Sequence, residues 1–246
     1  NRLPILFLPG DTYANRMPDP VLQQVEHFNN PGITANDAFK PVTRYFDRIT
    51  RPEQIIQSFP IAVQTMLDPA DCGPACIALS QDIQGQTFDY PEEFFKEKVH
   101  AIRRPRPDEF QIKEAAEKIK TSKNPIIISG GGVFYSDAME ELSNFAVKHN
   151  IPVTQTVMGY STMKRDHSHY AGQIGGLGGK NTNTLAKQTD LAIAVGTKLA
   201  DFTTGSWANF ENENFKLVSI NVSRFDANKH LAQAVVGDAK VSLNEL

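Results

Sequence analysis

The second half of this chain alternates short, continuously apolar runs with segments of helical periodicity, and this alternation limits the folds that it can adopt. The predicted strands lie at 125–129, 152–156, 191–195, 215–222 and 234–236. The predicted helices lie at 108–120, 136–149 and 181–188. Strands that are apolar on both faces must be covered on both faces, so the pattern predicts a parallel sheet between two layers of helices. We therefore expect a Rossmann-like, doubly wound α/β domain over residues 108–246.

The first half contains fewer predicted elements. Residues 5–8 and 74–79 read as buried strands, and a short helix is predicted over 19–28. A longer helix begins at the capping box that starts with Thr50, and apolar residues recur behind it at helical spacing. Pro60 interrupts that pattern, which predicts a kink or a local break in the helix.

Residues 84–107 separate the two α/β segments. Helical and strand periodicity fade there, aromatic residues lie among charges, and Pro105 and Pro107 end the stretch. We expect this long connection to pack on a surface through its aromatic side chains. The predicted organisation is therefore a first segment at 1–83, a linker at 84–107 and a second domain at 108–246.

Charge and cysteine content exclude several classes of protein. The net charge is −3, and the densest basic run, at 103–106, is too short to form a nucleic-acid surface. No run of apolar residues is long enough to span a membrane, and no secretory signal opens the chain. Cys72 and Cys76 are too few for a disulfide-stapled or zinc-bound domain, and we expect Cys76 to be a small buried hydrophobe. These features predict a cytoplasmic protein with neither a nucleic-acid nor a membrane partner.

The two ends of the chain suggest a larger protein. There is no initiator Met, the first residues already read as a strand, and residues 241–246 read as the opening of a helix. Natural termini usually trail off in polar residues. We therefore expect the chain to be an internal segment.

Two glycine-rich stretches are candidates for holding a nucleotide, because bare amides at a helix start can bind phosphate. For the first, 130–132, we favour a tight turn whose residues take positive φ. For the second, 172–179, a pyrophosphate loop and a close backbone crossing stay equally open. The candidate nucleotide-binding residues are Gly130, Gly131, Gly132, Gly175, Gly176 and Gly178. No acidic residue follows the strand at 152–156, so we do not expect a tightly bound NAD.

The remaining polar motifs form no recognisable catalytic or metal site. His167 and His169 lie beside Asp166, but without a third ligand a surface turn is favoured over a metal site. The stretch 236–239 superficially resembles the start of a magnesium–diphosphate motif, yet it lacks the second glycine and the distal Asn, and we interpret it as a strand end. No catalytic triad or carboxylate pair stands out. We predict no catalytic residue and no metal ligand in this chain.

Taken together, the motifs of the second half resemble a known family. Residues 112–246 are similar to the central domain of thiamine-diphosphate-dependent enzymes such as acetohydroxyacid synthase. The matching pieces are the strand and glycine turn at 125–132, the segments 150–153 and 169–175, the strand at 189–196 and the turn at Gly237. The segment 73–82 resembles the closing strand of the pyrimidine-binding domain of the same enzymes. The resemblance implies that 1–83 is the C-terminal part of that α/β domain.

The first half is also similar to one branch of the family, which opens a cyclic dione in myo-inositol catabolism. The similarity lies in segments 8–13, 19–24 and 36–42. It implies a hydrolase that breaks a C–C bond of a small cyclic substrate and releases an open-chain deoxy-hexuronate. It also implies the remaining domains of the full-length enzyme and further copies of it, in a dimer or tetramer, as partners.

The resemblance places the main cofactor ligands outside this chain. In the family, thiamine diphosphate is activated by a glutamate early in the pyrimidine-binding domain, and Mg²⁺ and diphosphate are held by a Gly-Asp-Gly…Asn stretch in a third domain. Neither motif occurs here, so the chain alone is expected to be inactive. The resemblance implies Gln23 and Lys40 as candidates for the substrate channel, although Leu22 stands where relatives show Phe. FAD, which the central domain holds in flavin-binding relatives, is not expected.

Two alternatives remain open at this stage. The first is an acetohydroxyacid synthase-like or decarboxylase enzyme with FAD in its central domain, which would be yellow when purified. The second is a non-catalytic nucleotide-binding module of the Rossmann type, which would bind NAD, FAD or ADP by itself.

Overall fold

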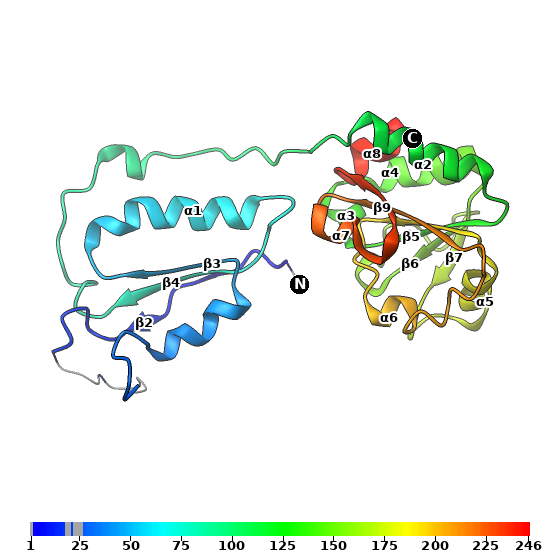
Figure 1. Ribbon diagram of the computed structural model, residues 1–246. Helices are drawn as coiled ribbons and strands as arrows, with labels where there is room; N and C mark the ends of the chain where they lie inside the picture. Colours follow the sequence, from blue (N-terminus) through cyan, green and yellow to red (C-terminus); the bar gives the residue numbers. More distant parts are fainter. Residues whose placement is uncertain (1, 18–20, 22–26) are drawn as a thin grey trace. The chain divides into compact units, whose positions relative to one another are not determined.

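The computed structural model describes residues 2–17, 21 and 27–246, and it divides into two compact units (Figure 1). Unit 1 is Asn1–Arg103 and unit 2 is Arg104–Leu246. The predicted helix over 19–28 falls largely on residues outside the described ones. Within the described part of the chain, each helix is too short or too polar to cross a membrane.

Unit 2 is built on a sheet in which every recorded pairing is parallel. Its strands are β5 (Pro125–Ser129), β6 (Val153–Gln155), β7 (Tyr170–Gln173), β8 (Leu191–Val195), β9 (Lys216–Asn221) and β10 (Gln233–Val236). They lie in the order β10-β9-β8-β5-β6-β7. The chain first adds strands on one side of β5 and then on the other, which confirms the doubly wound topology.

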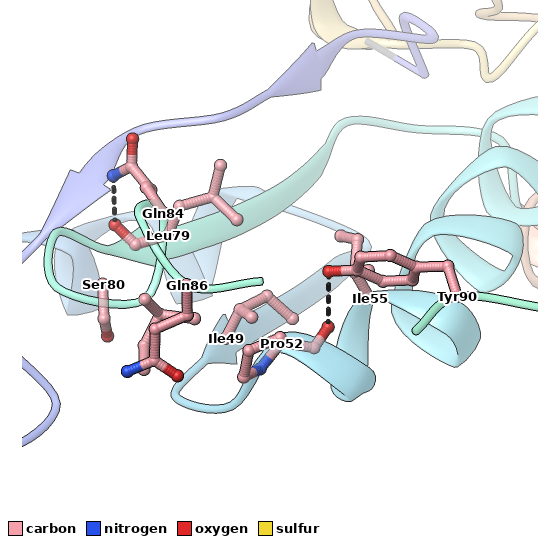
Figure 2. A pocket seen from close by; sticks show the side chains of 9 residues that line it. Ile49, Pro52, Ile55, Leu79, Ser80, Gln84, Gln86 and Tyr90 are labelled. Carbon is pink, nitrogen blue, oxygen red and sulfur yellow. Dashed lines mark hydrogen bonds between the residues drawn. The ribbon is translucent and has the colours of Figure 1, made fainter. Parts of the chain in front are cut away.

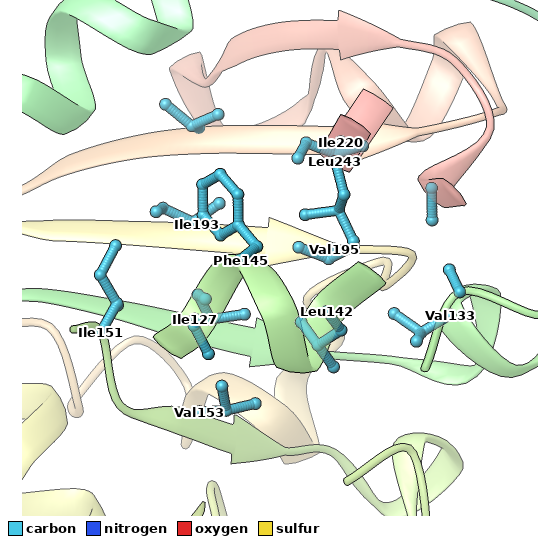
Figure 3. Close-up of a cluster of buried hydrophobic side chains, with 14 of the residues drawn as sticks. Ile127, Val133, Leu142, Phe145, Ile151, Val153, Ile193, Val195, Ile220 and Leu243 are labelled. Carbon is cyan, nitrogen blue, oxygen red and sulfur yellow. The ribbon is translucent and has the colours of Figure 1, made fainter. Parts of the chain in front are cut away.

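Helices cover both faces of this sheet. They are α2 (Glu109–Thr121), α3 (Gly131–Tyr135), α4 (Met139–His149), α5 (Lys180–Gln188), α6 (Asp201–Thr204), α7 (Arg224–Ala227) and α8 (Ala239–Glu245), with short 3-10 turns η4 (Val157–Gly159) and η5 (Lys229–Leu231). On one face, α2, α4 and α8 bury Ile127 and Ile193 (Figure 3). On the other, α5 and the loops after β8 bury Ile126 and Ile128. Successive strand residues therefore enter different cores, as continuous apolar strands require.

Unit 2 differs from the sequence prediction at β7 and before α4, and the four-residue helices α6 and α7 were not predicted. Strand β7 was not predicted, because its sequence is short and contains Gly172 rather than an apolar run. The helix predicted over 136–149 is α4, which begins at Met139, and a separate short helix, α3, precedes it. The break lies at Asp137, whose φ of 53° is incompatible with a continuing right-handed helix.

Unit 1 is a smaller parallel sheet with β4 (Ala75–Ser80) at its centre. Strands β1 (Leu6–Phe7) and β2 (Gly10–Asp11) pair with one side of β4, and β3 (Tyr45–Ile49) pairs with the other. Helix α1 (Ile55–Leu67) packs on one face through a core that includes Ile49, Ala62 and Ile77. The shorter elements are the 3-10 helices η1 (Ala35–Val42), η2 (Pro52–Gln54) and η3 (Glu92–Phe95).

Unit 1 differs from the sequence prediction at three places. Of residues 5–8, Leu6 and Phe7 form an edge strand rather than a buried one, because they pair only with β4, and the flanking Ile5 and Leu8 are each 50% exposed. Helix α1 continues through the exposed Pro60, so the local break is absent, and the kink stays a prediction. The capping box expected to start at Thr50 starts at Arg51 instead, and Oε1 of Gln54 accepts from the amides of Thr50 and Arg51.

The first part of the predicted linker packs on unit 1. Tyr90 donates its hydroxyl to the carbonyl of Pro52 over 3.3 Å. The Phe94 ring lies 6.4 Å from that of Phe59 on α1 in an edge-to-face arrangement. The aromatic residues among the charges therefore hold this stretch against a helix, as the sequence predicts.

The last part of the predicted linker is bound to unit 2. Arg104 donates to the carbonyl of Ser136 and pairs with Asp238 over 3.2 Å. The Asp238 amide in turn donates to the carbonyl of Pro105 over 2.8 Å. The stretch between these two sets of contacts, 96–103, is exposed throughout and lacks helix and strand.

We expect limited proteolysis to cut first within 96–103, because backbone without secondary structure fits a protease most readily. Brief trypsin digestion should cleave after Lys98 or Arg103 and leave a resistant fragment that begins at Arg104 or just before it, identified by mass spectrometry. First cuts inside α5 or β8 would place the boundary elsewhere.

Candidate functional site

A cluster of charged side chains lies at the carboxyl edge of the sheet in unit 1. Arg48 on β3 donates from Nε to Oδ2 of Asp11, the last residue of β2, over 2.6 Å. Its Nη2 donates to Oδ2 of Asp37 on η1, also over 2.6 Å. The Nζ of Lys40 lies 2.5 Å from Oδ1 of Asp37. We refer to Asp11, Asp37, Lys40 and Arg48 as the Arg48 cluster.

Strand alternation separates this cluster from helix α1. The neighbouring residue, Asp47, points to the opposite face, where its carboxylate accepts from Ser58 of α1. Arg48 therefore faces η1, on the side of the sheet that α1 does not cover. The Asp11 side chain is completely buried, whereas the Lys40 side chain is 53% exposed. The cluster thus runs from the sheet interior to the surface.

A capping box fixes the element that carries Asp37 and Lys40. Thr34 is the N-cap of η1: its hydroxyl accepts from the Asn36 amide over 3.2 Å, and its own amide donates to Oδ2 of Asp37 over 2.7 Å. Arg48 also donates from Nη2 to the Thr34 hydroxyl over 2.9 Å. The first turn of η1 is therefore held by hydrogen bonds within the turn and by a hydrogen bond from Arg48 on β3.

Asp37 is held as a carboxylate. Burial alone raises the pKa of this group, but hydrogen bonds from Lys40, from the Thr34 amide and from Arg48 outweigh burial and lower the pKa to about 2. Lys40 and Arg48 also lie over the Phe46 ring, at 5.2 and 5.8 Å from its centroid. The two cations are thus placed by both a carboxylate and an aromatic face.

The structure places only one of the two predicted channel residues. Gln23, like Leu22, lies outside the described residues, whereas Lys40 belongs to the Arg48 cluster. Asp11 and Arg48 were missed, because charged residues inside or directly after strands interrupt the apolar runs from which strands are predicted. Polar residues at the carboxyl ends of parallel strands share one edge of a sheet, but β2 and β3 were not predicted, so this rule could not find them.

A pocket of about 250 Å³ lies at the same end of β3 and β4, on the α1 side (Figure 2). Its walls include Ile49, Leu79 and Ile83. Two of its polar groups are already bonded within the chain, because Gln84 donates to the Leu79 carbonyl and Tyr90 to Pro52. The pocket is a partly open recess with both apolar and polar walls, the latter including Ser80 and Gln86, and we assign it no ligand.

The glycines at 130–132 serve a close approach of two backbones. The Gly130 amide donates to the Val195 carbonyl and the Gly132 amide to the Gly196 carbonyl, each over 2.9 Å. A Cβ on Gly132 would lie 2.6 Å from the Cα of Gly196. Gly130, Gly131 and Gly132 do not take positive φ, so that part of the prediction was wrong. Nucleotide binding here stays a prediction, with two of the three amides already engaged.

The second glycine loop is also bonded within unit 2. The amide of Gly175 donates to the Asn183 side chain, that of Gly176 to the Phe202 carbonyl, and that of Gly178 to the Gly175 carbonyl, over 2.8 to 3.0 Å. Gly175 has a φ of 97°, and a Cβ there would lie 2.1 Å from the Phe202 carbonyl oxygen. The loop is a close backbone crossing, and a nucleotide at these glycines stays a prediction.

The turn with two histidines is bonded within itself and to α4. Nδ1 of His167 accepts from the His169 amide over 3.1 Å, so Nε2 carries the proton of the neutral ring and donates to Ser143 over 2.9 Å. His167 is thus not placed to take a proton from Ser143. Among the described residues, no group of three or more His, Cys, Asp or Glu could hold a metal ion.

The described residues do not fit a magnesium–diphosphate site. Asp238, the acidic residue of the stretch 236–239, is the N-cap of α8 and accepts from the amides of Lys240 and Val241. Its carboxylate is further paired with Arg104. The single carboxylate that resembles a metal ligand is therefore committed to a helix cap, and the carboxylates at the other end of the chain, Asp11 and Asp37, are committed to Arg48.

The family profile and the similar proteins of known name point to the same family. The family profile described as thiamine pyrophosphate enzyme, central domain, matches residues 112–246. Over all 246 residues, the chain is 49% identical to the 3D-(3,5/4)-trihydroxycyclohexane-1,2-dione hydrolase of Clostridium perfringens (strain 13 / Type A) and 47% identical to that of Bacillus subtilis (strain 168). It spans 38% and 39% of the length of these two relatives.

Solved structures show the same fold at lower identity. The benzoylformate decarboxylase of Polynucleobacter necessarius matches 100% of this chain and 44% of its own, with a TM-score of 0.75 and 21% identity. A putative thiamin diphosphate-dependent enzyme of Mycobacterium smegmatis matches 98% of this chain and 44% of its own, with a TM-score of 0.74 and 21% identity.

We expect Gly175→Ala to be far more destabilising than Gly176→Ala. The first change puts a Cβ on a residue with positive φ and against a carbonyl, and should lower the free energy of unfolding by roughly 1–3 kcal/mol or more. At Gly176 a Cβ would lie 3.5 Å from the Phe202 ring, an ordinary contact, so the loss should stay within about 0.5 kcal/mol. Denaturant unfolding followed by Trp207 fluorescence measures both. Equal losses of unfolding free energy in the two variants would contradict the assignment of the loop as a close backbone crossing at Gly175.

We expect Asp37→Asn to destabilise unit 1 in a pH-dependent way. The folded-state pKa of about 2 lies below the ordinary 3.8, so the stability from this carboxylate is complete above about pH 4 and is lost as the pH falls towards 2. Far-UV circular dichroism at pH 5 and 2.5 compares the variant with the wild type. Trp207, the single tryptophan, lies in unit 2, so its fluorescence transition is the internal control. A gap as large at pH 2.5 as at pH 5 would contradict the pKa.

Proposed function

This chain belongs to the thiamine pyrophosphate enzymes, and on that premise we propose that a protein containing it hydrolyses 3D-(3,5/4)-trihydroxycyclohexane-1,2-dione. The bond that breaks joins the two carbonyl carbons. The hydroxyl of water goes to one carbon, which becomes a carboxylate, and hydrogen goes to the other, which becomes an aldehyde. The product is the open-chain 5-deoxy-glucuronate.

The single observation that carries this proposal is the extent of the similarity. Nearly half of the residues are identical to the named hydrolases over both units and the connection between them, not over the central domain alone. A nucleotide-binding module would need only the part that matches the central domain. The match across unit 1, which contains the Arg48 cluster, favours a shared substrate.

We place the ligands of thiamine diphosphate and Mg²⁺ in parts of the protein outside this chain. When bound, the cofactor supplies an electron sink for breaking a C–C bond beside a carbonyl. Because the described residues do not fit it, the contribution of this chain is confined to binding and orientation. Lys40 is the exposed cation of the Arg48 cluster, and the family resemblance makes it, together with Gln23, a candidate for the substrate channel.

Several further properties belong to the same proposal. The protein acts as a dimer or tetramer in the cytoplasm, binds Mg²⁺ and lacks FAD. Residues 1–83 form the end of the pyrimidine-binding domain, 84–107 the linker and 108–246 the central domain. The glycines at 130–132 and 175–178 are structural, because most of their amides are bonded within unit 2.

We expect the full-length protein, with thiamine diphosphate and Mg²⁺, to convert the dione to one carboxylate and one aldehyde per turnover. A pH-stat measures the acid released, and proton NMR measures the aldehyde. The 246-residue chain under the same conditions is the control and should show no turnover. Condensation of pyruvate by a yellow, FAD-containing protein, with no reaction of the dione, would contradict the proposal and favour an acetohydroxyacid synthase-like enzyme.

A further inference from the structure

We propose that Arg48 is a positioning residue, which holds the Lys40 ammonium in place by fixing the carboxylate of Asp37. This inference deepens the proposed function, since it rests on Lys40 meeting the substrate there. It assigns Arg48 no contact with the substrate itself.

The two oxygens of Asp37 are divided between different partners. Oδ2 accepts from Nη2 of Arg48 and from the Thr34 amide, at 2.6 and 2.7 Å. Oδ1 is the oxygen that meets Lys40, at 2.5 Å. Two bonds to Oδ2 fix the plane of the carboxylate, and this plane sets the direction in which Oδ1 holds the ammonium.

Arg48 connects this carboxylate to the sheet. Its Nε is bonded to Asp11, whose side chain is completely buried at the end of β2. The planar guanidinium therefore spans a fixed distance between a sheet strand and η1. Lysine has a single nitrogen and cannot bond both carboxylates with the same geometry. We call the contacts of Arg48 with Asp11 and Asp37 the clamp. The clamp depends on the shape of the arginine side chain and not only on its charge.

The exposed end of the Arg48 cluster carries the positive charge of Lys40, which can interact with a negatively charged ligand. The Lys40 side chain is 53% exposed, so its ammonium is accessible to a ligand. Hydrolysis of the dione produces a carboxylate, and a preorganised cation stabilises such charge better than a mobile one. The Phe46 ring, 5.2 Å away, further limits where the ammonium can lie.

The test is a double-mutant cycle in the full-length enzyme with Arg48→Lys and Lys40→Met. We expect Arg48→Lys to lower kcat/KM roughly 10- to 100-fold, because a displacement of about 1 Å in a positioned group can cost on the order of 100-fold. In the Lys40→Met background, the same change should lower kcat/KM by no more than about twofold, since the group that Arg48 positions is already gone. Additive losses, or an unchanged kcat/KM in the single variant, would overturn the inference.

Arg51→Lys is the matched control. Arg51 lies three residues away, is 74% exposed and pairs with Glu53, so its exchange should leave kcat/KM unchanged. Hydrogen exchange in the same full-length variants separates the inference from the proposed function. If the wild type does not act on the dione, the proposed function falls. The clamp still predicts that amides of 34–42 exchange faster in Arg48→Lys than in Arg51→Lys, and equal exchange would overturn it.

Discussion

All the strand pairings in the described part of this chain are parallel, and both units depend on that constraint. Parallel neighbours cannot be joined by a tight turn, so each connection crosses a face of the sheet and covers it. In unit 2 these crossovers form two complete layers, and Ile127 and Ile128 enter different cores. In unit 1, α1 covers one face, and the short η1 lies on the other beside the Arg48 cluster.

Parallel pairing also gathers the carboxyl ends of all strands at one edge of each sheet. In unit 1 this brings Asp11 and Arg48 together and lets Arg48 reach η1. In unit 2 it brings the turn after β5 against the loop after β8, so closely that Gly132 and Gly196 leave no room for a side chain. The same geometric rule thus yields a charged cluster in one unit and a backbone contact in the other.

The Arg48 cluster is better explained by geometry than by stability. Removing Asp11 and Arg48 from water costs free energy that their attraction largely offsets, so a buried ion pair contributes little net stability compared with an apolar pair. What such a pair does supply is a fixed direction, because a guanidinium and two carboxylates fit in few arrangements. As a result, the position of the exposed Lys40 ammonium is fixed, through Asp37 and Arg48, by the buried Asp11 of the sheet.

The sequence by itself determined the family, the doubly wound sheet of unit 2 and most of its strands. The reason is that strands buried on both faces, such as β5 and β8, are continuous apolar runs. Such runs can be recognised in the sequence without knowing which strands lie beside them. Strand β3 and the Arg48 cluster were decided only by the tertiary structure. Asp47 and Arg48 read as surface charges along the chain, and their burial becomes favourable only when Ser58, Asp37 and Asp11, up to 37 positions away, supply the bonds that replace water.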